Sequence, residues 1–251
     1  MHRVAQQRAA TPGETLRQFY LTLLESLGPQ GWWPARTRLE IILGAILTQN
    51  TAWRNAWLAL KNLRKAGLLT WRALRRAYLR ELESCVRPAG FYRQKARTIH
   101  GFADWLERTQ GGSLDTLFSM KSARSRQQLL SLKGIGPETA DAILLYAGRQ
   151  PLFVSDAYTR RVLSRHQLLP ATANYESAQQ FLHAHLPADE AMFGEFHALL
   201  VEAAKRYCRR KVAHCEGCPL RKFLPQGDTQ RLPRPASIFR DRPMALASEP
   251  A

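Results

Sequence analysis

The residues whose types and spacing indicate chemistry lie between Leu129 and Arg165. Apolar residues lead into the turn Gly134-Ile135-Gly136, and a second helix is predicted to begin at Pro137, because proline suits the first position of a helix. Asp156 follows about twenty residues after the turn. Its carboxylate could cap the next helix, or it could stabilise positive charge on a substrate and orient water.

The turn and the start of the second helix form a predicted phosphate site. The first N–H groups of a helix have no partner within the helix, and they bind phosphate. Both glycines are expected to allow positive φ and close approach of a ligand. The residues expected to contact a nucleic-acid backbone in this way are Lys133, Gly134, Ile135, Gly136, Glu138 and Thr139. On this motif alone, a hairpin with only a structural role remains the alternative.

Composition agrees with a nucleic-acid partner. The formal net charge of +17 on 251 residues indicates a polyanionic ligand. The length suits one large domain or two small ones. No apolar run approaches the length of a membrane span, and residues 1–10 lack the apolar core of a signal peptide. We therefore expect a cytoplasmic, nucleoid-associated protein without a membrane partner.

Helical periodicity runs through the chain. Apolar residues recur at helical spacing and no convincing strand pattern occurs, so the sequence predicts an all-α protein. The segment 38–50 is apolar nearly all round, which is typical of a central buried helix. Outside the hairpin, further helices are expected at 14–27, 52–66, 71–78, 79–86, 93–107, 157–166, 177–186 and 190–210.

Several side chains outside the hairpin are candidates for contacting a base. Trp32, Trp33 and Pro34 form a predicted loop, and two adjacent tryptophans cannot easily share one buried face. With Trp53 they could stack on a base, although they could also simply wedge between domains. Gln49 closes the buried helix, where an amide needs hydrogen-bond partners.

The hairpin followed by Asp156, together with Gly90-Phe91-Tyr92-x-x-Lys95-Ala96, resembles the helix-hairpin-helix (HhH-GPD) DNA glycosylases of the endonuclease III family. The resemblance covers roughly residues 14–222. It implies two all-α domains with double-stranded DNA in the cleft between them. One domain would be 38–147, ending in the hairpin, and the other 13–37 plus 148–225. We expect residues 1–12 to be disordered and 226–251 to form a disordered basic tail.

The resemblance also implies a base-excision repair activity. Such enzymes flip a damaged base out of the duplex and hydrolyse its N-glycosidic bond, which builds positive charge on the sugar. By its match to the family motif, Asp156 would be the catalytic carboxylate. Gln49 would fill the hole left by the base, and the pocket would comprise Trp32, Trp33, Pro34 and Trp53. We expect a monomer that needs no cofactor for the chemistry.

Departures from the family pattern narrow the prediction. Bifunctional members use a lysine where this chain has Glu138, and a carboxylate cannot act as an amine nucleophile. This predicts a monofunctional enzyme with weak or absent AP-lyase activity. The Trp32-Trp33-Pro34 loop, residues 47–51 and Glu138 resemble the endonuclease III-like 3-methyladenine glycosylases, and aromatic walls suit cationic alkylpurines.

Other functions stay open on the sequence. Within the same family, the chain could be a glycosylase/AP lyase for oxidised pyrimidines or a mismatch thymine glycosylase. In a different class, it could be a non-catalytic DNA-binding helix-hairpin-helix protein, which has no need of Asp156.

Three cysteines follow part of the family's iron–sulfur motif. Cys208, Cys215 and Cys218 have the spacing C-x6-C-x2-C, but the place of the fourth ligand of a 4Fe-4S cluster holds Leu224. We favour loss of the cluster, against a cluster completed by His214 or water, or a zinc site that uses His214. The remaining histidines lack metal or triad spacing and are expected to be structural; they include His100, His166, His183, His185 and His197.

Overall fold

The computed structural model describes residues 10–225, and the regular structure within this range is helical. The prediction of an all-α protein is confirmed: residues 10–225 contain no strand beyond the isolated bridge between Cys208 and Ala213. The α-helices are α1 (Pro12–Leu27), α2 (Arg38–Leu47), α3 (Trp53–Lys65), α4 (Trp71–Arg76), α5 (Leu79–Val86), α6 (Tyr92–Gln110), α7 (Leu114–Phe118), α8 (Ser122–Leu130), α9 (Pro137–Ala142), α10 (Ala157–Arg165), α11 (Tyr175–His185) and α12 (Glu190–Arg206). A π-helical turn, η2 (Ile143–Ala147), continues α9, and short 3₁₀ turns are η1 (Arg87–Ala89), η3 (Cys215–Gly217) and η4 (Pro219–Phe223).

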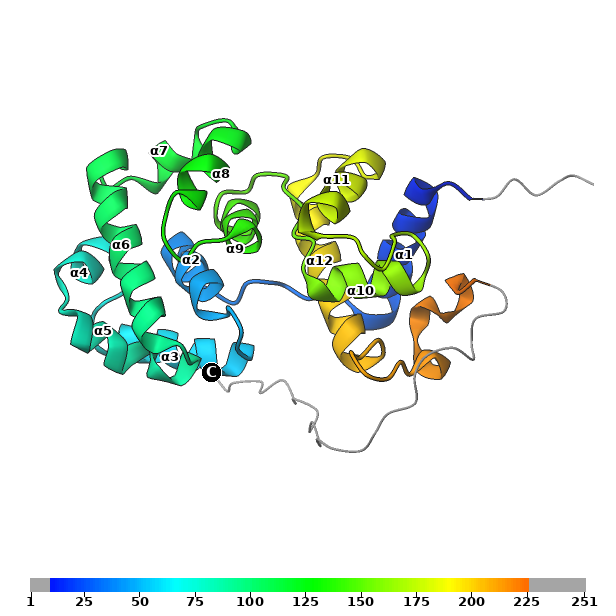
Figure 1. Cartoon of the computed structure of the whole chain (residues 1–251), viewed down its shortest axis with the longest axis horizontal. Coiled ribbons are helices and arrows are strands. Elements are labelled where there is room, and N and C mark those ends of the chain that lie inside the picture. Colours follow the sequence, from blue (N-terminus) through cyan, green and yellow to red (C-terminus); the bar gives the residue numbers. More distant parts are fainter. Residues whose placement is uncertain (1–9, 226–251) are drawn as a thin grey trace, which may run out of the picture.

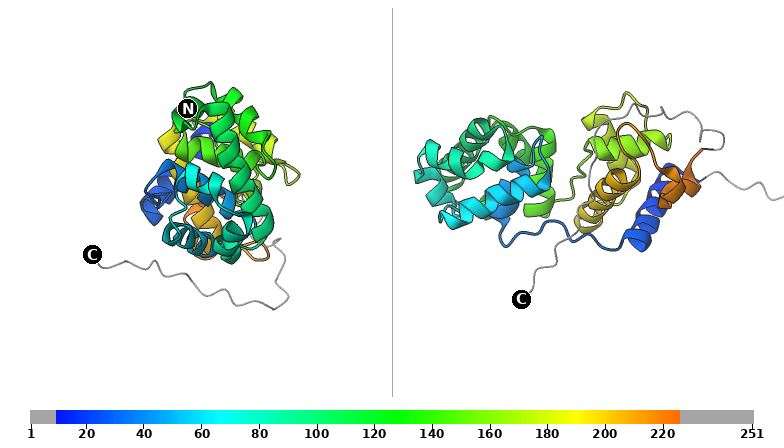
Figure 2. Two further views of the ribbon diagram at one scale, coloured as in Figure 1. Left: turned by 90° about the vertical axis from the view of Figure 1, so that its left-hand side faces the viewer. Right: turned by 90° about the horizontal axis from the view of Figure 1, so that it is seen from below.

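The helices form two groups. Figure 1 shows α2 to α9 together on one side, with α1 and α10 to α12 on the other. The first helix therefore packs with the last ones, and α1 contacts α12, α11 and η4. Figure 2 shows the same two groups from below, joined by the chain on either side of α2–α9. The exact domain boundaries, 38–147 against 13–37 plus 148–225, stay a prediction.

The first helix begins earlier than the sequence indicated. Thr11 caps α1 in a reciprocal capping box with Glu14, and Pro12 occupies the first turn. The helix thus starts inside the segment 1–12, which was predicted to be disordered as a whole. Residues 1–9 and the predicted tail 226–251 lie outside the described residues. Within the described range, no helix has the length and apolar character that a membrane crossing requires.

The central helix α2 is buried on most of its surface, as its apolar sequence predicts. It ends at Leu47, before Gln49, and a buried cation holds this end. Lys95 of α6 is 4% exposed, and its Nζ donates to the carbonyls of Leu47 (2.9 Å), Gln49 (2.8 Å) and Ala89 (2.7 Å). The ammonium satisfies carbonyl groups that a helix end leaves free.

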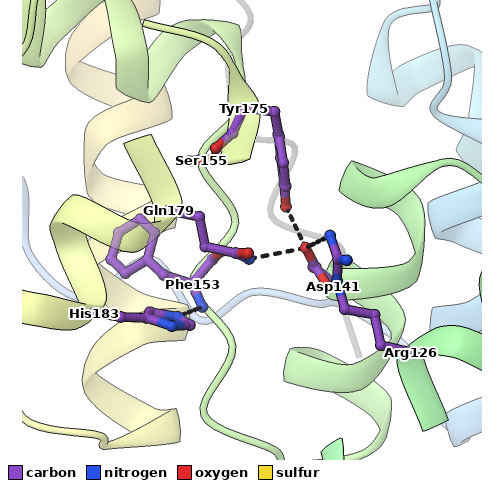
Figure 3. A network of polar contacts seen from close by, with 7 residues as sticks. All are labelled: Arg126, Asp141, Phe153, Ser155, Tyr175, Gln179 and His183. Carbon is purple, nitrogen blue, oxygen red and sulfur yellow. Dashed lines mark hydrogen bonds and ion pairs between the residues drawn. The ribbon is translucent and has the colours of Figure 1, made fainter. Parts of the chain in front are cut away.

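A buried polar network joins the two groups of helices (Figure 3). Asp141 of α9 is fully buried and accepts two hydrogen bonds from Arg126 of α8, from Nε at 2.7 Å and from Nη2 at 3.1 Å. From α11, the Tyr175 hydroxyl and Gln179 Nε2 each donate to Asp141 Oδ2 at 2.8 Å. The network thus fixes α11 against the second helix of the hairpin.

The same network holds the connecting segment before α10. Gln179 Nε2 also donates to the carbonyl of Phe153 (2.7 Å), and the Phe153 N–H donates to His183 Nε2 (2.9 Å). Ser155, which is fully buried, donates from Oγ to the carbonyl of Tyr175 (2.6 Å). The backbone that leads into Asp156 is therefore held on both sides.

Candidate active site

Asp156 is the N-cap of α10, with extended backbone (φ −63°, ψ 179°), and Oδ1 accepts the Thr159 N–H at 2.7 Å. The side chain is buried, and Oδ2 faces His197 Nε2 at 3.6 Å. The capping interpretation of Asp156 is thus confirmed. Each carboxylate oxygen has two lone pairs, so the cap leaves Asp156 with acceptor capacity for other chemistry.

His197 lies on α12, which packs against α10, the helix that Asp156 caps. It is 6% exposed, and its Nδ1 lies 2.6 Å from the Tyr146 hydroxyl. The hydroxyl of Tyr146, in the π-helical turn η2, also lies 3.0 Å from the carbonyl of Gly194, to which it can donate. Burial raises the pKa of Tyr146 well above its usual value, and Asp156 adds to this effect, so the phenol keeps its proton.

The carboxylate of Asp156 is kept ionised against its burial. Burial alone would raise the pKa of Asp156, but His197 and the Thr159 N–H outweigh it, so this pKa is lowered from its ordinary value. Sequence reasoning missed His197 as a neighbour of Asp156. The available signal was a histidine in the largely apolar segment Phe193–Val201, whose one other polar side chain is Glu195, because a buried imidazole needs a partner.

The predicted pocket tryptophans converge on the same neighbourhood. Trp32 meets His197 edge-on with the ring centroids 5.6 Å apart. Trp33 packs edge-on against Trp53 at 5.0 Å and Tyr146 at 5.7 Å. A Cβ atom on Gly44 would approach the Trp33 ring to 2.8 Å, so this packing requires glycine in α2. Pro34, which follows the two tryptophans, is exposed.

Glu138 shares its electrostatic surroundings with Asp156. As a whole residue Glu138 is exposed, yet desolvation of its carboxyl group raises its pKa, and Asp156 adds to that effect. His197 and Arg160 act in the opposite direction. Two carboxyl groups near one site therefore have pKa values that move apart, a pattern typical of acid–base sites.

The hairpin has the expected helix start with one difference. Gly134 has φ +92°, and a Cβ there would lie 2.1 Å from Thr98 Oγ1, so this position requires glycine. Gly136 has φ −94° and caps α9 with extended backbone, so the expected positive φ at this second glycine is wrong. Ile135 is buried and anchors the turn, whereas Lys133 is exposed.

Gln49 lies against the hairpin. Its Nε2 donates to the carbonyl of Gly134 (3.0 Å) and to Thr139 Oγ1 (2.9 Å). Phe91, in the motif that also contains Lys95, is 68% exposed and has φ +44°. Because Lys95 binds the carbonyls of both Gln49 and Ala89, the exposed Phe91 follows a turn that is tied to the Gln49 turn.

The three cysteines lie close together beside α10. Burial raises the pKa of the Cys215 and Cys218 thiols, and each is raised further by the neighbouring thiols. Arg165 Nη1 donates to Cys208 Sγ (3.2 Å) and to the carbonyl of Arg209 (2.8 Å). No group of three or more His, Cys, Asp or Glu side chains within residues 10–225 is arranged to hold a metal ion. With Leu224 in the fourth place, these residues do not fit a four-thiolate cluster.

Comparisons with known proteins agree with this geometry. The model of the HhH-GPD superfamily of base excision DNA repair proteins matches residues 43–187. The protein named "Putative DNA repair glycosylase MJ1434" from Methanocaldococcus jannaschii is 39% identical over 211 residues, which cover 84% of this chain and 96% of the relative.

Two solved structures have a similar fold. A non-covalent endonuclease III–DNA complex superposes with a TM-score of 0.73 at 20% identity, covering 86% of this chain and 96% of the other. The Helicobacter pylori 3-methyladenine DNA glycosylase MagIII bound to 1,N6-ethenoadenine gives a TM-score of 0.67 at 28% identity, covering 78% and 98% respectively.

Proposed function

This chain belongs to the HhH-GPD superfamily of base excision repair DNA glycosylases, and we propose that it is a monofunctional enzyme that removes alkylated purines, 3-methyladenine above all, from double-stranded DNA. The observation that carries the proposal is the buried carboxylate of Asp156 in the neighbourhood of the predicted pocket tryptophans, with a second carboxylate, Glu138, near it. The similarity to an alkylpurine glycosylase that binds 1,N6-ethenoadenine supports the lesion class.

The chemistry follows from the state of Asp156. When the N-glycosidic bond breaks, its electron pair leaves with the base and the sugar carbon becomes positive. The ionised carboxylate stabilises that charge in a buried site, where electrostatic effects are strong. Water then adds to the same carbon and gives up a proton, for which a nearby carboxylate is a suitable acceptor. An alkylated purine leaves readily because it already carries positive charge.

Recognition of DNA would use the hairpin and the turns beside it. The backbone at the start of α9, which no side chain caps, would bind phosphate, with Lys133 exposed next to it. Gln49 would leave its hydrogen bonds to the hairpin and enter the space of the flipped base. Phe91 is exposed on a turn linked to Gln49 through Lys95 and would contact the distorted duplex. The net charge of +17 supports this binding electrostatically.

Glu138 supports the monofunctional character. A Schiff base needs an unprotonated amine at the sugar carbon, and this place in α9 holds a carboxyl group with a raised pKa. A carboxyl group cannot form that bond. It can instead hold or release a proton near the departing base, which suits hydrolysis without strand cleavage.

The test is chromatography of the free bases that the purified protein releases from methylated duplex DNA. We expect 3-methyladenine to be released and the strand to break only after alkali treatment. Release of oxidised pyrimidines or mismatched thymine instead would replace the lesion class. DNA binding without release of any base would leave only the non-catalytic interpretation.

A matched variant tests the role of Glu138. Glu138→Lys places an amine at the lyase position, and borohydride should then trap a covalent complex with DNA that the wild-type protein does not form. Glu138→Gln is the control, because it removes the charge without supplying an amine. Trapping of the wild-type protein at a comparable yield would contradict a monofunctional enzyme.

A further inference from the structure

His197 is a buried group to which the proposed glycosylase chemistry has so far assigned no step. Its Nε2 atom is buried, has no hydrogen-bond partner, and faces Asp156 Oδ2 at 3.6 Å. Its Nδ1 atom is held by the Tyr146 hydroxyl at 2.6 Å. The imidazole is therefore clamped on one side and directed at the carboxylate on the other.

The hydrogen-bond partners determine which proton His197 carries. The Tyr146 hydroxyl has one proton, which it can give either to the Gly194 carbonyl or to His197 Nδ1. If Nδ1 accepts, a neutral imidazole carries its proton on Nε2. If the carbonyl takes the hydroxyl proton, Nδ1 must donate, and only an imidazolium avoids placing a bare Nε2 lone pair before the Asp156 carboxylate. In both arrangements Nε2 carries a proton directed at Asp156.

We propose that His197 is a positioning residue for Asp156: its Nε2 side, which faces Oδ2 at 3.6 Å, acts electrostatically to keep the carboxylate ionised and oriented, while Tyr146 holds the imidazole in that orientation. The proposal rests on the glycosylase function proposed above. Thr159 donates a hydrogen bond to Oδ1 and His197 faces Oδ2 beyond hydrogen-bond distance, so each oxygen of the carboxylate has one neighbouring group that restricts its rotation. At least one lone pair on each oxygen stays available for the sugar.

The charged groups around the pair do not replace His197. Arg160 of α10 directs its Nη1 to the Ser155 carbonyl at 2.8 Å rather than to Asp156. Glu138 carries the same sign of charge as Asp156 and raises rather than lowers the cost of ionisation. The titratable and charged groups that face the pair from the packed elements are Glu138 of α9, Tyr146 of η2, Arg160 of α10 and Glu195 of α12, with Lys205 of α12 over the Trp32 ring.

Two amide substitutions distinguish the contributions of the two imidazole nitrogens. The Nε2 of glutamine stands near the place of histidine Nε2, so His197→Gln keeps a donor toward Asp156. The amide of His197→Asn reaches only the place of Nδ1 and faces Tyr146. The variants differ by one methylene, and both replace the imidazole with a neutral amide, so their difference reports the donor at Nε2.

The first measurement needs no substrate. Full-length protein with 13Cγ-labelled aspartate is titrated by NMR, and the Asp156 signal is assigned with Asp156→Asn; glutamates, including Glu138, are silent. The midpoint of the Asp156 titration should be lowest in the wild type, higher in His197→Gln and highest in His197→Asn, where it should lie about one pH unit above that of the wild type. Equal midpoints in the three proteins, or equal midpoints in the two variants, would overturn the proposal.

The second measurement is the pH profile of base release under single-turnover conditions. The acidic limb should move to higher pH in the order of the NMR midpoints, and the plateau rate of His197→Asn should fall by up to roughly a hundredfold, with partial rescue in His197→Gln. Affinity for duplex DNA with a non-cleavable abasic analogue should stay the same. Equal losses in both variants with unshifted limbs would indicate a packing role and overturn the proposal.

A variant at Tyr146 keeps the proposal testable if the His197 variants do not fold. Tyr146→Phe removes the hydroxyl that holds Nδ1 and leaves His197 in place, so it should move the Asp156 midpoint upward by less than His197→Asn does. An unchanged midpoint in a folded Tyr146→Phe protein would overturn the clamp. If wild type releases no base while the NMR order holds, the glycosylase proposal fails and the pairing of His197 with Asp156 stands.

Discussion

Two buried carboxylates, Asp141 and Asp156, stand at the junction between the two groups of helices, yet their surroundings differ. Asp141 is fully buried and accepts four hydrogen bonds, two from Arg126 and one each from Tyr175 and Gln179. Asp156 is almost as buried but accepts one hydrogen bond, from the Thr159 N–H, with His197 just beyond hydrogen-bond distance.

The difference separates a structural charge from a reactive one. A buried charge that accepts bonds on every side is stabilised, and it has nothing left to offer a ligand. A buried charge with few partners keeps acceptor capacity for a ligand, and its ionisation depends on a few neighbouring groups, an arrangement typical of residues that do chemistry. Among buried carboxylates, the number of partners therefore indicates function better than the depth of burial.

The largest effect is expected from Asp156→Asn. Asparagine caps a helix about as well as aspartate, so α10 should persist and the midpoint of thermal unfolding should change little. Removal of the charge opposite the forming sugar cation should lower single-turnover base release by about a thousandfold. The measurement pairs this rate with affinity for a non-cleavable duplex, which should be retained.

Asp156→Ala provides the contrast, because it removes both the charge and the cap. It should lose activity as Asp156→Asn does and in addition lose about 1 kcal/mol of unfolding free energy. Full activity in a folded Asp156→Asn protein would contradict the catalytic assignment of Asp156, and with it the distinction between a structural Asp141 and a reactive Asp156.

Asp141→Asn should have the opposite profile. It leaves the buried side of Arg126 without its ion-pair partner, and breaking such a pair costs about 3–5 kcal/mol of unfolding free energy. Urea unfolding should show this loss, whereas base release by the fraction that stays folded should fall far less than in Asp156→Asn. A stable Asp141→Asn protein with the activity loss of Asp156→Asn would show that the two carboxylates share one role.

The sequence predicted the elements better than the contacts between them. The helix 79–86 and the start at Pro137 follow from local patterns, and α5 and α9 begin where those patterns indicate. Asp156 could be singled out from the sequence because the hairpin and this aspartate lie within one short stretch of the chain. The partners of His197 could not be identified from the sequence, because Asp156 and Tyr146 lie 41 and 51 residues before it. Helical periodicity gives no information about contacts over such separations.

The anchoring of Gln49 was missed for a similar reason. A terminal amide on a buried helix indicates that partners exist, but not that Gly134 and Thr139 supply them. The Cys spacing indicated a ligand set, yet the Arg165 hydrogen bond to Cys208 Sγ comes from a helix about forty residues earlier in the chain. Tertiary packing decides these contacts, and local patterns cannot report it.

Lys95→Met extends the comparison to a buried cation whose hydrogen bonds are all made. Lys95 resembles Asp141 in having its bonding capacity filled, here by three carbonyls. Methionine has similar length and cannot donate, so the variant should lose roughly 2–3 kcal/mol of unfolding free energy, about one for each unsatisfied carbonyl. The rate of base release should fall far less than in Asp156→Asn, since Lys95 acts on the site only through the backbone turns that carry Gln49 and Phe91.

The pH dependence of this loss has a defined sign. Burial lowers the pKa of Lys95 from 10.5 to about 8. Between these values the unfolded chain binds more protons than the folded one, so folding becomes more favourable as pH rises. The stability difference between wild type and Lys95→Met should therefore grow from about pH 8 to pH 10.5. A difference that shrinks over this range would contradict burial as the dominant effect.

The smallest effect is expected from Tyr175→Phe, which removes one of the donors to Asp141 and leaves Arg126 and Gln179 in place. Losing one bond from a carboxylate that keeps others should cost about 1 kcal/mol of unfolding free energy, with base release unchanged. The backbone carbonyl of Tyr175, which accepts from Ser155 beside Asp156, is untouched by the substitution. A rate loss above tenfold at unchanged stability would therefore mean that the Tyr175 hydroxyl, through Asp141, sets the position of Asp156. In that case the structural carboxylate would belong to the catalytic machinery, and the number of hydrogen-bond partners would no longer separate the two roles.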